Sequence, residues 1–449
     1  MTATAQLSAP PARSTEPSIY TRSFWLAYAA NLALVTANSL TFRFADYVEF
    51  FGGSKALTGS IVQAGLIAAI AFRLVLGRAI DRHGPRRVWL ACCAVFGVGC
   101  LAYLSAERVS WVLWMARISQ QVGVAGMFTC SIVNIQDQVP PHRRTEVIGS
   151  LGSSGFIGTV LGTNLGDLIF RLLPDGRAPF IATFGTTLVG GLLHTLLVLV
   201  LTRRECHISP PQSPNPWSLL WRHWPGPVVW VSLAMGTSFA ITTVFLSRFA
   251  SAAGLGGIAM FFLPYSLVAF ACRWWMRDWG QRLGRHKMVL WGLTGLAAGQ
   301  LLLLAVRSTA WLIPAGSACG FGHALLFPAV VSLGAGRFPS EYRGTGTTLV
   351  LGFQEIGLAI AAPLLGLLID RGTLRQGMPD PSDGPGAGLL GYDLAFLVSA
   401  AVAVVSGVWY VLTAARHPDH DGQPLATIGH GPVVEAETDQ GDLVVVSTE

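Results

Sequence analysis

Several ionisable residues lie inside long apolar stretches of this sequence, where a charge is costly and therefore marks a candidate for function. Glu355 is the clearest of them, because it lies within the apolar run GFQEIGLAIAAPLLGL. Apolar surroundings favour the neutral form of a carboxyl group, so such a side chain is suited to taking up and releasing a proton. Glu355 is a candidate proton carrier; the alternative is a structural partner for a buried arginine.

Two further residues complete a candidate set for proton coupling. Arg117 lies in the apolar run around ARISQQVG, and His323 lies in GFGHALLFP. Histidine titrates near neutral pH, and an arginine beside a carboxylate stabilises its charged form. We therefore expect Glu355, Arg117 and His323 to couple protons, with Arg117 as the counter-charge of Glu355. His194, in another apolar stretch, is a further histidine that could titrate near neutral pH.

Polar and cationic residues in other apolar stretches are candidates for binding a solute. Arg73 and Arg273 occupy equivalent positions and could hold an anion, although both could instead extend to a membrane surface. Amides in the same stretches could line a cavity or bond one helix to another. The candidate solute-binding set is Asn31, Asn38, Gln63, Gln120, Gln354, Arg73 and Arg273.

The sequence contains no nucleophile motif, phosphate-binding loop or metal-ligand cluster. It therefore favours neither an enzyme nor an ATP-driven pump, and we expect no cofactor and no metal. A net charge of +6 would suggest a nucleic-acid partner in a soluble protein. Here the basic residues lie in short loops beside apolar segments, so we expect no nucleic acid.

The composition is that of a membrane protein. The 449 residues are 52% hydrophobic and 12% charged, and the mean hydropathy is +0.52. A helix needs about 20 mostly apolar residues to cross a bilayer. Twelve stretches qualify, so we predict an all-α membrane protein with twelve transmembrane helices. They are 24–44, 60–80, 88–104, 111–135, 147–172, 180–202, 228–249, 258–276, 288–306, 310–335, 347–369 and 390–413.

The chain repeats itself at an offset of 200 residues. Arg73 and Gly84 recur as Arg273 and Gly284, and Arg143 recurs as Arg343. A repeat of this length indicates two related halves. We predict two pseudo-symmetric six-helix bundles at 23–202 and 227–413, joined by a linker at 203–226. The ends, 1–22 and 414–449, are predicted to be tails, and the acidic second tail is predicted to be disordered.

The loop GRAIDRHGPRR, between the second and third apolar stretches, resembles the signature loop of the major facilitator superfamily of transporters. The resemblance implies that this loop latches the cytoplasmic side when the outward-facing state forms. Asp81 could bind the N-terminus of a neighbouring helix there. The latch residues are Gly77, Asp81, Arg82, Gly84, Arg86 and Arg87. In the second half, Gln281 replaces the aspartate and Arg277 the first glycine, which leaves a second latch open.

Other motifs resemble particular exporters of that superfamily. The spacing Gly149, Gly158, Gly162 is similar to the glycine motif of its antiporters, but Thr163 stands where that motif has proline. The surroundings of Glu355 and His323 resemble bacterial arabinose-efflux-like and sugar-efflux-like exporters. Arg117 resembles the arginine of a motif linked in the family to proton transfer. The glycines could equally be plain packing residues.

Lysine and arginine set the expected orientation. About 18 of the 30 fall in the tails and even-numbered loops, so both termini are predicted to be cytoplasmic. No cleavable signal peptide is recognisable, and we expect a monomer in a bacterial inner membrane.

These features predict a secondary active transporter that exports a small organic molecule in exchange for protons, by alternating access. Two alternatives remain. Arg73, Arg117 and Arg273 suit a proton-coupled importer of an organic anion. The altered loop at Arg277 and Gln281 suits a non-transporting membrane sensor or scaffold of the same fold.

Overall fold

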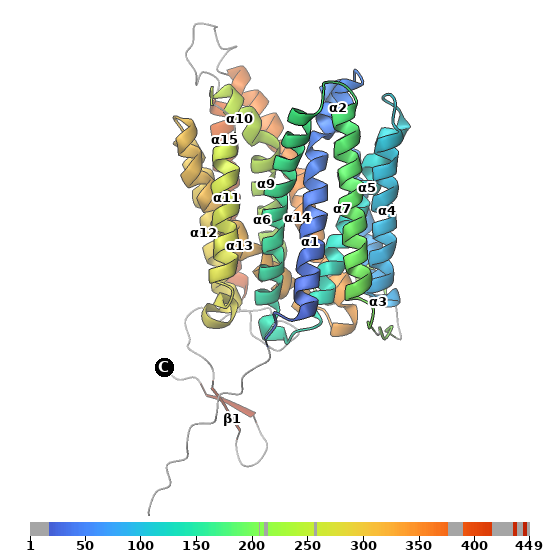
Figure 1. The fold of residues 1–449 in the computed structure, drawn as a ribbon. Helices are drawn as coiled ribbons and strands as arrows, with labels where there is room; N and C mark the ends of the chain where they lie inside the picture. The colour runs from blue at the N-terminus through green and yellow to red at the C-terminus, as the bar shows by residue number, and fades with distance from the viewer. Residues whose placement is uncertain are drawn as a thin grey trace, which may run out of the picture.

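Long helices running side by side make up the body of the protein (Figure 1). The computed structural model describes residues 18–205, 207–210, 214–255, 258–375, 389–414, 434–437 and 443–446. Each of the twelve predicted apolar stretches is helical along most of its length, and those at 24–44 and 228–249 continue through a short 3-10 or π-helical turn into a second helix, which confirms the predicted all-α fold.

The first half runs from α1 to α7. Its helices are α1 (Arg22–Leu40), α2 (Phe44–Phe50), α3 (Lys55–His83), α4 (Pro85–Ser105), α5 (Trp111–Gln136), α6 (Arg144–Leu172) and α7 (Ala178–Leu201), with short 3-10 turns at Thr41–Arg43 and Pro141–Arg143. The hydroxyl of Thr21 and that of Ser54 cap the starts of α1 and α3. Between α3 and α4 the backbone reverses at Gly84, whose φ of 82° favours glycine, and Pro85 opens the next helix.

The second half repeats this arrangement after the short helix α8 (Pro216–Arg222) in the linker. Its helices are α9 (Val228–Ala240), α10 (Leu246–Ala252), α11 (Ala259–Trp275), α12 (Arg285–Leu304), α13 (Leu312–Gly336), α14 (Arg343–Arg375) and α15 (Leu390–Ala414). A π-helical turn, Ile241–Phe245, joins α9 to α10, and another, Gly280–Gly284, precedes α12; 3-10 turns lie at Thr309–Trp311 and Ser340–Tyr342.

The acidic C-terminal tail contains two short strands. β1 (Val434–Glu437) and β2 (Leu443–Val446) pair antiparallel, with Val434 opposite Val446. This hairpin is not anticipated by the sequence analysis, and the rest of the tail lies outside the described residues.

Eight helical segments of the described chain are long and apolar enough to cross a membrane by length and composition. Four others are less apolar or shorter: α1, α5, α6 and α11. They carry many of the polar candidates, including Asn31, Gln120 and Arg273. Helices that bury polar groups against their neighbours need less apolar surface than helices that face lipid, which explains the difference.

Glycines set the closest helix contacts within each half. A Cβ atom on Gly162 of α6 would lie 2.4 Å from the carbonyl oxygen of Thr36 on α1. In the second half, a Cβ on Gly357 of α14 would lie 2.4 Å from the carbonyl oxygen of Leu233 on α9. Backbones can approach this closely only without side chains. The pairs α1–α6 and α9–α14 are therefore equivalent contacts in the two halves.

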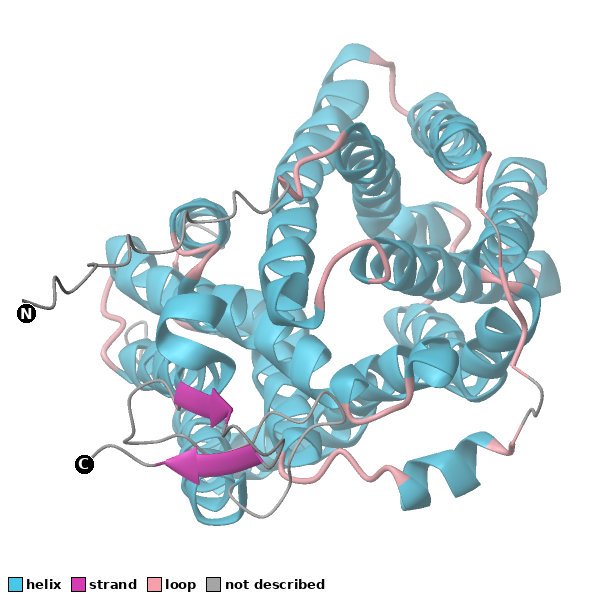
Figure 2. Ribbon diagram, turned by 90° about the horizontal axis from the view of Figure 1, so that it is seen from below, coloured by secondary structure: helices cyan, strands magenta, loops and turns pink. Residues whose placement is uncertain are grey.

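Both ends of the helical body lie on one side, because Ile19 and Ala414 belong to the same buried cluster. We call this side the tail face and the opposite side the far face; Figure 2 views the molecule from the tail face. The two halves meet through α3 with α14, and through α6 with α11 and α13. These pairs position the candidate site.

Candidate functional site

A bidentate ion pair joins the two halves near mid-height. Nε and Nη2 of Arg73 on α3 donate to the two carboxylate oxygens of Glu355 on α14, at 2.6 and 2.5 Å. The third nitrogen, Nη1, donates to the hydroxyl of Thr129 at 2.9 Å. At 1.5 Å per residue, Arg73 lies about 15 Å from the tail end of α3, and Glu355 about 18 Å from the start of α14. The pair is therefore deep in a bilayer about 30 Å thick.

The partner expected for Glu355 from the sequence, Arg117, is wrong. Arg117 lies near the far-face end of α5, where its Nη1 donates to Gln120 at 3.0 Å and its guanidinium lies 5.2 Å from the ring centre of Phe44. Both contacts are inside the first half. Arg73, which the sequence analysis assigned to solute binding, takes the place beside Glu355 because α3 and α14 cross between the halves.

The signature loop holds the start of α14. The Asp81 carboxylate accepts hydrogen bonds from the backbone N–H of Gly344 at 2.8 Å, the N–H of Thr345 at 3.0 Å and the hydroxyl of Thr345. A helix N-terminus favours an anion, as the sequence analysis anticipated for Asp81. Gly77 allows the approach, since a Cβ there would lie 2.5 Å from the Cα of Thr345.

The linker after α7 contacts the backbone of the same loop. His207 Nε2 contacts the carbonyl oxygen of Asp81 at 2.8 Å, and the Ser209 hydroxyl donates to the carbonyl oxygen of Arg82 at 2.6 Å. The backbone N–H of Arg86 donates to Glu205 at 3.2 Å. Burial raises the pKa of the Glu205 carboxyl, which this N–H and His207 oppose. Arg87, also predicted for the latch, is exposed and lines a basic cavity of about 280 Å³ beside these residues.

A second inter-half contact stands where the repeat would place a second latch. The amide of Gln281 donates to the Glu146 carboxylate at 2.9 Å, and Glu146 also pairs with Arg143. Gly280 permits this contact, because its Cβ would lie 3.1 Å from Cβ of Thr145. The second loop therefore does meet the start of α6. In the first contact the carboxylate, Asp81, lies in the loop, whereas in the second the carboxylate, Glu146, lies on the helix. The glycine that allows the close approach is Gly77 in the first contact and Gly280 in the second, although Arg277 occupies the position that repeats Gly77.

Arg273 lies among aromatic rings between the halves. Its guanidinium carbon is 4.7 Å from the ring centre of Phe156 on α6 and 5.3 Å from that of Phe327 on α13. His323, a predicted proton-coupling residue, stacks on Phe327 with an interplanar angle of 7°. His323 therefore belongs to this aromatic cluster and does not lie at the Arg73–Glu355 pair.

The predicted polar lining divides into buried and accessible residues. Gln120 is wholly buried and bonds to Asn38, Thr41 and Tyr103. Asn31 donates to Ser154 at 2.7 Å. These amides hold helices of the first half together. Gln63 is exposed and Gln354 is half-buried.

His194 has a structural role. Its Nε2 accepts from the indole N–H of Trp89 at 2.9 Å, and its Nδ1 contacts the carbonyl oxygen of Ala30 at 2.7 Å. Nδ1 must carry the proton to bond a carbonyl, so both nitrogens are committed in the neutral form. At the far-face end, Arg43 pairs with Asp46, three residues on, at 2.9 Å, and also with Asp167.

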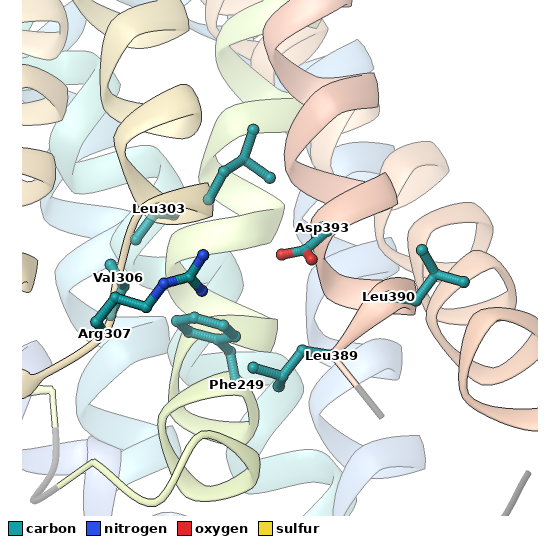
Figure 3. Close-up of a pocket in the computed structure, with 8 residues that line it drawn as sticks. Phe249, Leu303, Val306, Arg307, Leu389, Leu390 and Asp393 are labelled. Atoms are coloured by element: carbon teal, nitrogen blue, oxygen red, sulfur yellow. The ribbon is translucent and has the colours of Figure 1, made fainter. Parts of the chain in front are cut away.

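A separate pocket of about 140 Å³ opens within the second half at the far face. Figure 3 shows Arg307 and Asp393 pointing toward each other across it, beside Phe249. All its lining residues come from α10, α12, α15 and the adjoining loops, so it does not lie between the halves.

Sequence reasoning missed Thr129, Glu146, Glu205 and the aromatic rings around Arg273. The rings and Thr129 are ordinary members of apolar helices. Glu146 and Glu205 lie in polar surroundings that suggest solvent exposure. Only the repeat could have indicated Glu146. It makes the start of α6, where Glu146 lies, equivalent to the start of α14, which Asp81 binds.

Two helical bundles that enclose charged groups at mid-height, and meet through paired loops at one face, define a membrane-embedded carrier. The family model described as Major Facilitator Superfamily matches residues 24–279 and 258–438, so the chain belongs to this family. Members are transporters and not enzymes, and the protein is accordingly a multi-pass secondary transporter of a small molecule across a lipid bilayer.

Individual proteins that the chain resembles belong to the same superfamily. An uncharacterized MFS-type transporter of Salmonella typhimurium is 21% identical over 373 residues, covering 81% of this chain and 89% of the relative. The Escherichia coli fucose:proton symporter FucP, solved in the outward conformation, has a TM-score of 0.67 at 15% identity, with 87% of this chain and 99% of FucP covered. The proton:xylose symporter XylE, solved with 6-bromo-6-deoxy-D-glucose, has a TM-score of 0.66 at 14% identity, covering 90% and 97%.

Proposed function

We propose that this transporter exports a small organic molecule in exchange for protons, and that Glu355 carries the proton. The observation that carries the proposal is the Arg73–Glu355 pair across the two halves. Protonation of Glu355 would remove its charge and weaken the bond that holds α3 to α14 at mid-height. A proton would thereby change the relative stability of the two access states, which is the requirement for coupling.

Burial supports a coupling role for this pair. The Arg73 side chain is 6% exposed, while Glu355 is 24% exposed and so remains open to proton exchange. Breaking a buried ion pair by neutralising one partner costs about 3 to 5 kcal/mol. Binding of a solute near Glu355 would compensate this cost in one access state.

The orientation and the motif resemblance together support the proposed direction of transport. The excess of lysine and arginine supports a cytoplasmic tail face. Described contacts between the halves lie at the tail-face ends of the helices, at Asp81 and at Glu146. With a cytoplasmic tail face, this arrangement corresponds to closure toward the cytoplasm. The resemblance of the sequences around Glu355 and His323 to sugar-efflux-like exporters supports export, in a bacterial inner membrane.

The glycine motif of α6 does not add support for antiport. Gly158 and Gly162 pack against α1 in their own half, and Gly149 and Gly152 face the second half. These contacts explain the glycines by packing. The pairing of Gln281 with Glu146 likewise removes the motivation for a non-transporting sensor, because the second loop still reaches the first half.

The test is Glu355→Gln in purified protein reconstituted into proteoliposomes. The solute is first found by a thermal-shift screen of the wild type against sugars, antibiotics, siderophores and organic acids. We expect Glu355→Gln to abolish uptake driven by an imposed pH difference and to remove the pH dependence of solute affinity. Exchange of solute for solute, which needs no net proton movement, should persist.

Glu341→Gln serves as the matched control, because Glu341 is an exposed carboxylate before the start of the same helix. Its gradient-driven uptake should equal that of the wild type. If Glu355→Gln protein still concentrates solute under a pH difference, the assignment is wrong and His323 is the next candidate. Measuring uptake in inverted membrane vesicles against right-side-out vesicles gives the direction.

A further inference from the structure

Arg73 and Arg273 are related by the 200-residue repeat, and they pass the opposite half in the same way. Gly352 on α14 lies beside Arg73, since a Cβ there would be 3.5 Å from its Cδ. Gly152 on α6 lies beside Arg273, where a Cβ would be 2.2 Å from Nη1. The two arginines therefore occupy equivalent sites at the two crossings between the halves.

The two crossings differ in charge. Glu355 neutralises Arg73, but the residue 200 positions before Glu355 is Gly155, so the equivalent carboxylate is missing. Nε and Nη2 of Arg273 are buried without a hydrogen-bond partner among the described residues, and no described carboxylate pairs with it. The side chain is 5% exposed. A buried cation with unpaired donors is unfavourable unless a counter-charge can be supplied.

Space exists for such a counter-charge. A Cβ built on Gly155 meets no atom within 4 Å outside its own helix backbone, whereas Cβ atoms on its neighbours Gly152 and Gly158 collide. The site is thus open at the position where symmetry would place a carboxylate, one helical turn from Gly152.

Aromatic rings lie beside Arg273, and one of them belongs to Phe156, the residue next to Gly155. Phe156 lies 5.9 Å from Tyr265 and 6.0 Å from His323, and Phe239 lies 5.5 Å from His323, between ring centres. Phe156, Tyr265, His323 and Phe239 are each partly exposed, while Arg273 is buried. Rings of this kind favour a flat apolar body, and the two rings on the guanidinium leave its donor edge free.

We propose that the transported solute is an organic anion with a planar apolar body, whose carboxylate or similar group binds Arg273 beside Gly155. The solute would supply the charge that Glu355 supplies at the other crossing. Its planar part would pack against Phe156, Tyr265 and His323. This proposal rests on the proposed transport function and adds its substrate class.

The test uses full-length purified protein with four aromatic carboxylates as probes: benzoate, salicylate, 4-hydroxybenzoate and indole-3-acetate. Benzamide and indole-3-acetamide are the neutral counterparts. We expect at least one carboxylate to raise the melting temperature of the wild type while its amide does not. Arg273→Met should weaken carboxylate affinity by about 100-fold or more. Because the variant removes an unpaired buried charge, its melting temperature without probe should equal or exceed that of the wild type.

Gly155→Glu is the more specific variant, because it would place a carboxylate on α6 within reach of Arg273. It should abolish the response to the carboxylate, and Gly155→Gln, which has the same shape without the charge, should retain a large part of it. Arg171→Gln, an exposed arginine near the end of the same helix, should respond as the wild type does.

The proposal is overturned if no carboxylate stabilises the wild type more than its amide, or if Gly155→Glu and Arg273→Met respond as the wild type does. These results are distinct from failure of the proposed function. Carboxylate binding without proton-driven flux would contradict proton coupling and leave the substrate class standing. Proton-driven flux of a neutral solute that persists in Arg273→Met would contradict the substrate class and leave proton coupling standing.

Discussion

At the scale of single residues, the same side-chain types have different roles because their partners differ. Arg73 has a carboxylate, and Arg117 has an amide and a ring. Arg273 lies against two rings, and its Nε and Nη2 have no hydrogen-bond partner among the described residues. A charge inside a bilayer is stable only with such compensation. The degree of compensation therefore separates a coupling arginine from a structural one and from one that can receive an anion.

Asp81→Asn tests the first latch. The asparagine keeps one acceptor oxygen but loses the charge and one acceptor at the start of α14, so closure of the tail face should weaken by about 1.5 to 3 kcal/mol. Transport should fall by about 10-fold or more, while membrane insertion and solute affinity stay close to wild type. Flux assays with a binding isotherm measure both, and Arg78→Gln, an exposed position on the same helix, is the control. Unchanged flux would show that the loop does not act as a latch and that its basic residues only set the membrane orientation.

At the scale of helices, the two crossings between the halves use the same geometry with different chemistry. α3 delivers Asp81 to the start of α14, and the turn before α12 delivers Gln281 to the start of α6. A carboxylate on a helix N-terminus is stabilised by the helix dipole. An amide that donates to a helix carboxylate has only one hydrogen bond. The second crossing is thus the weaker of the two and should open first.

Gln281→Glu tests this second crossing. Two carboxylates would face each other where the structure has a 2.9 Å hydrogen bond, which disfavours the closed tail face by about 1 to 2 kcal/mol after screening. Spin labels are placed at Ala91→Cys and Trp291→Cys, which are exposed positions on the tail-face halves of α4 and α12. We expect the mean distance between the labels to increase or its distribution to broaden. The labels are measured in a background without the other cysteines. Gln281→Met, which loses the bond without adding charge, should give a smaller change, and an unaltered distance in both variants would exclude a latch here.

At the scale of the whole molecule, the two halves are held together near one face and separately packed near the other. The linker runs under the signature loop, where His207 and Ser209 contact its backbone. The start of the linker is therefore bound to the first half, and we expect it to move with the signature loop when Asp81 leaves α14.

Orientation is tested by labelling in intact cells, in a background with Cys206→Ser. Ser105→Cys lies at the far-face end of α4, and Ser218→Cys lies in the linker helix α8. We expect an impermeant maleimide to label the first variant, and the second only after the membrane is permeabilised. The described native cysteines are all buried and should not react. The opposite pattern would reverse the orientation, and with it the assignment of the latch to the cytoplasmic side.

The sequence alone determines which segments are helices and which loops are rich in lysine and arginine, because apolar length and local charge are properties of neighbouring residues. It also carries the repeat, and with it the equivalence of Arg73 with Arg273. The tertiary structure decides which residues meet across the halves. Arg73 and Glu355 are 282 positions apart, and no local rule distinguishes Arg73 from Arg117 as the partner. The unpaired state of Arg273 depends in the same way on the fold, because the contacts between the halves place Gly152 and Phe156 of α6 against it.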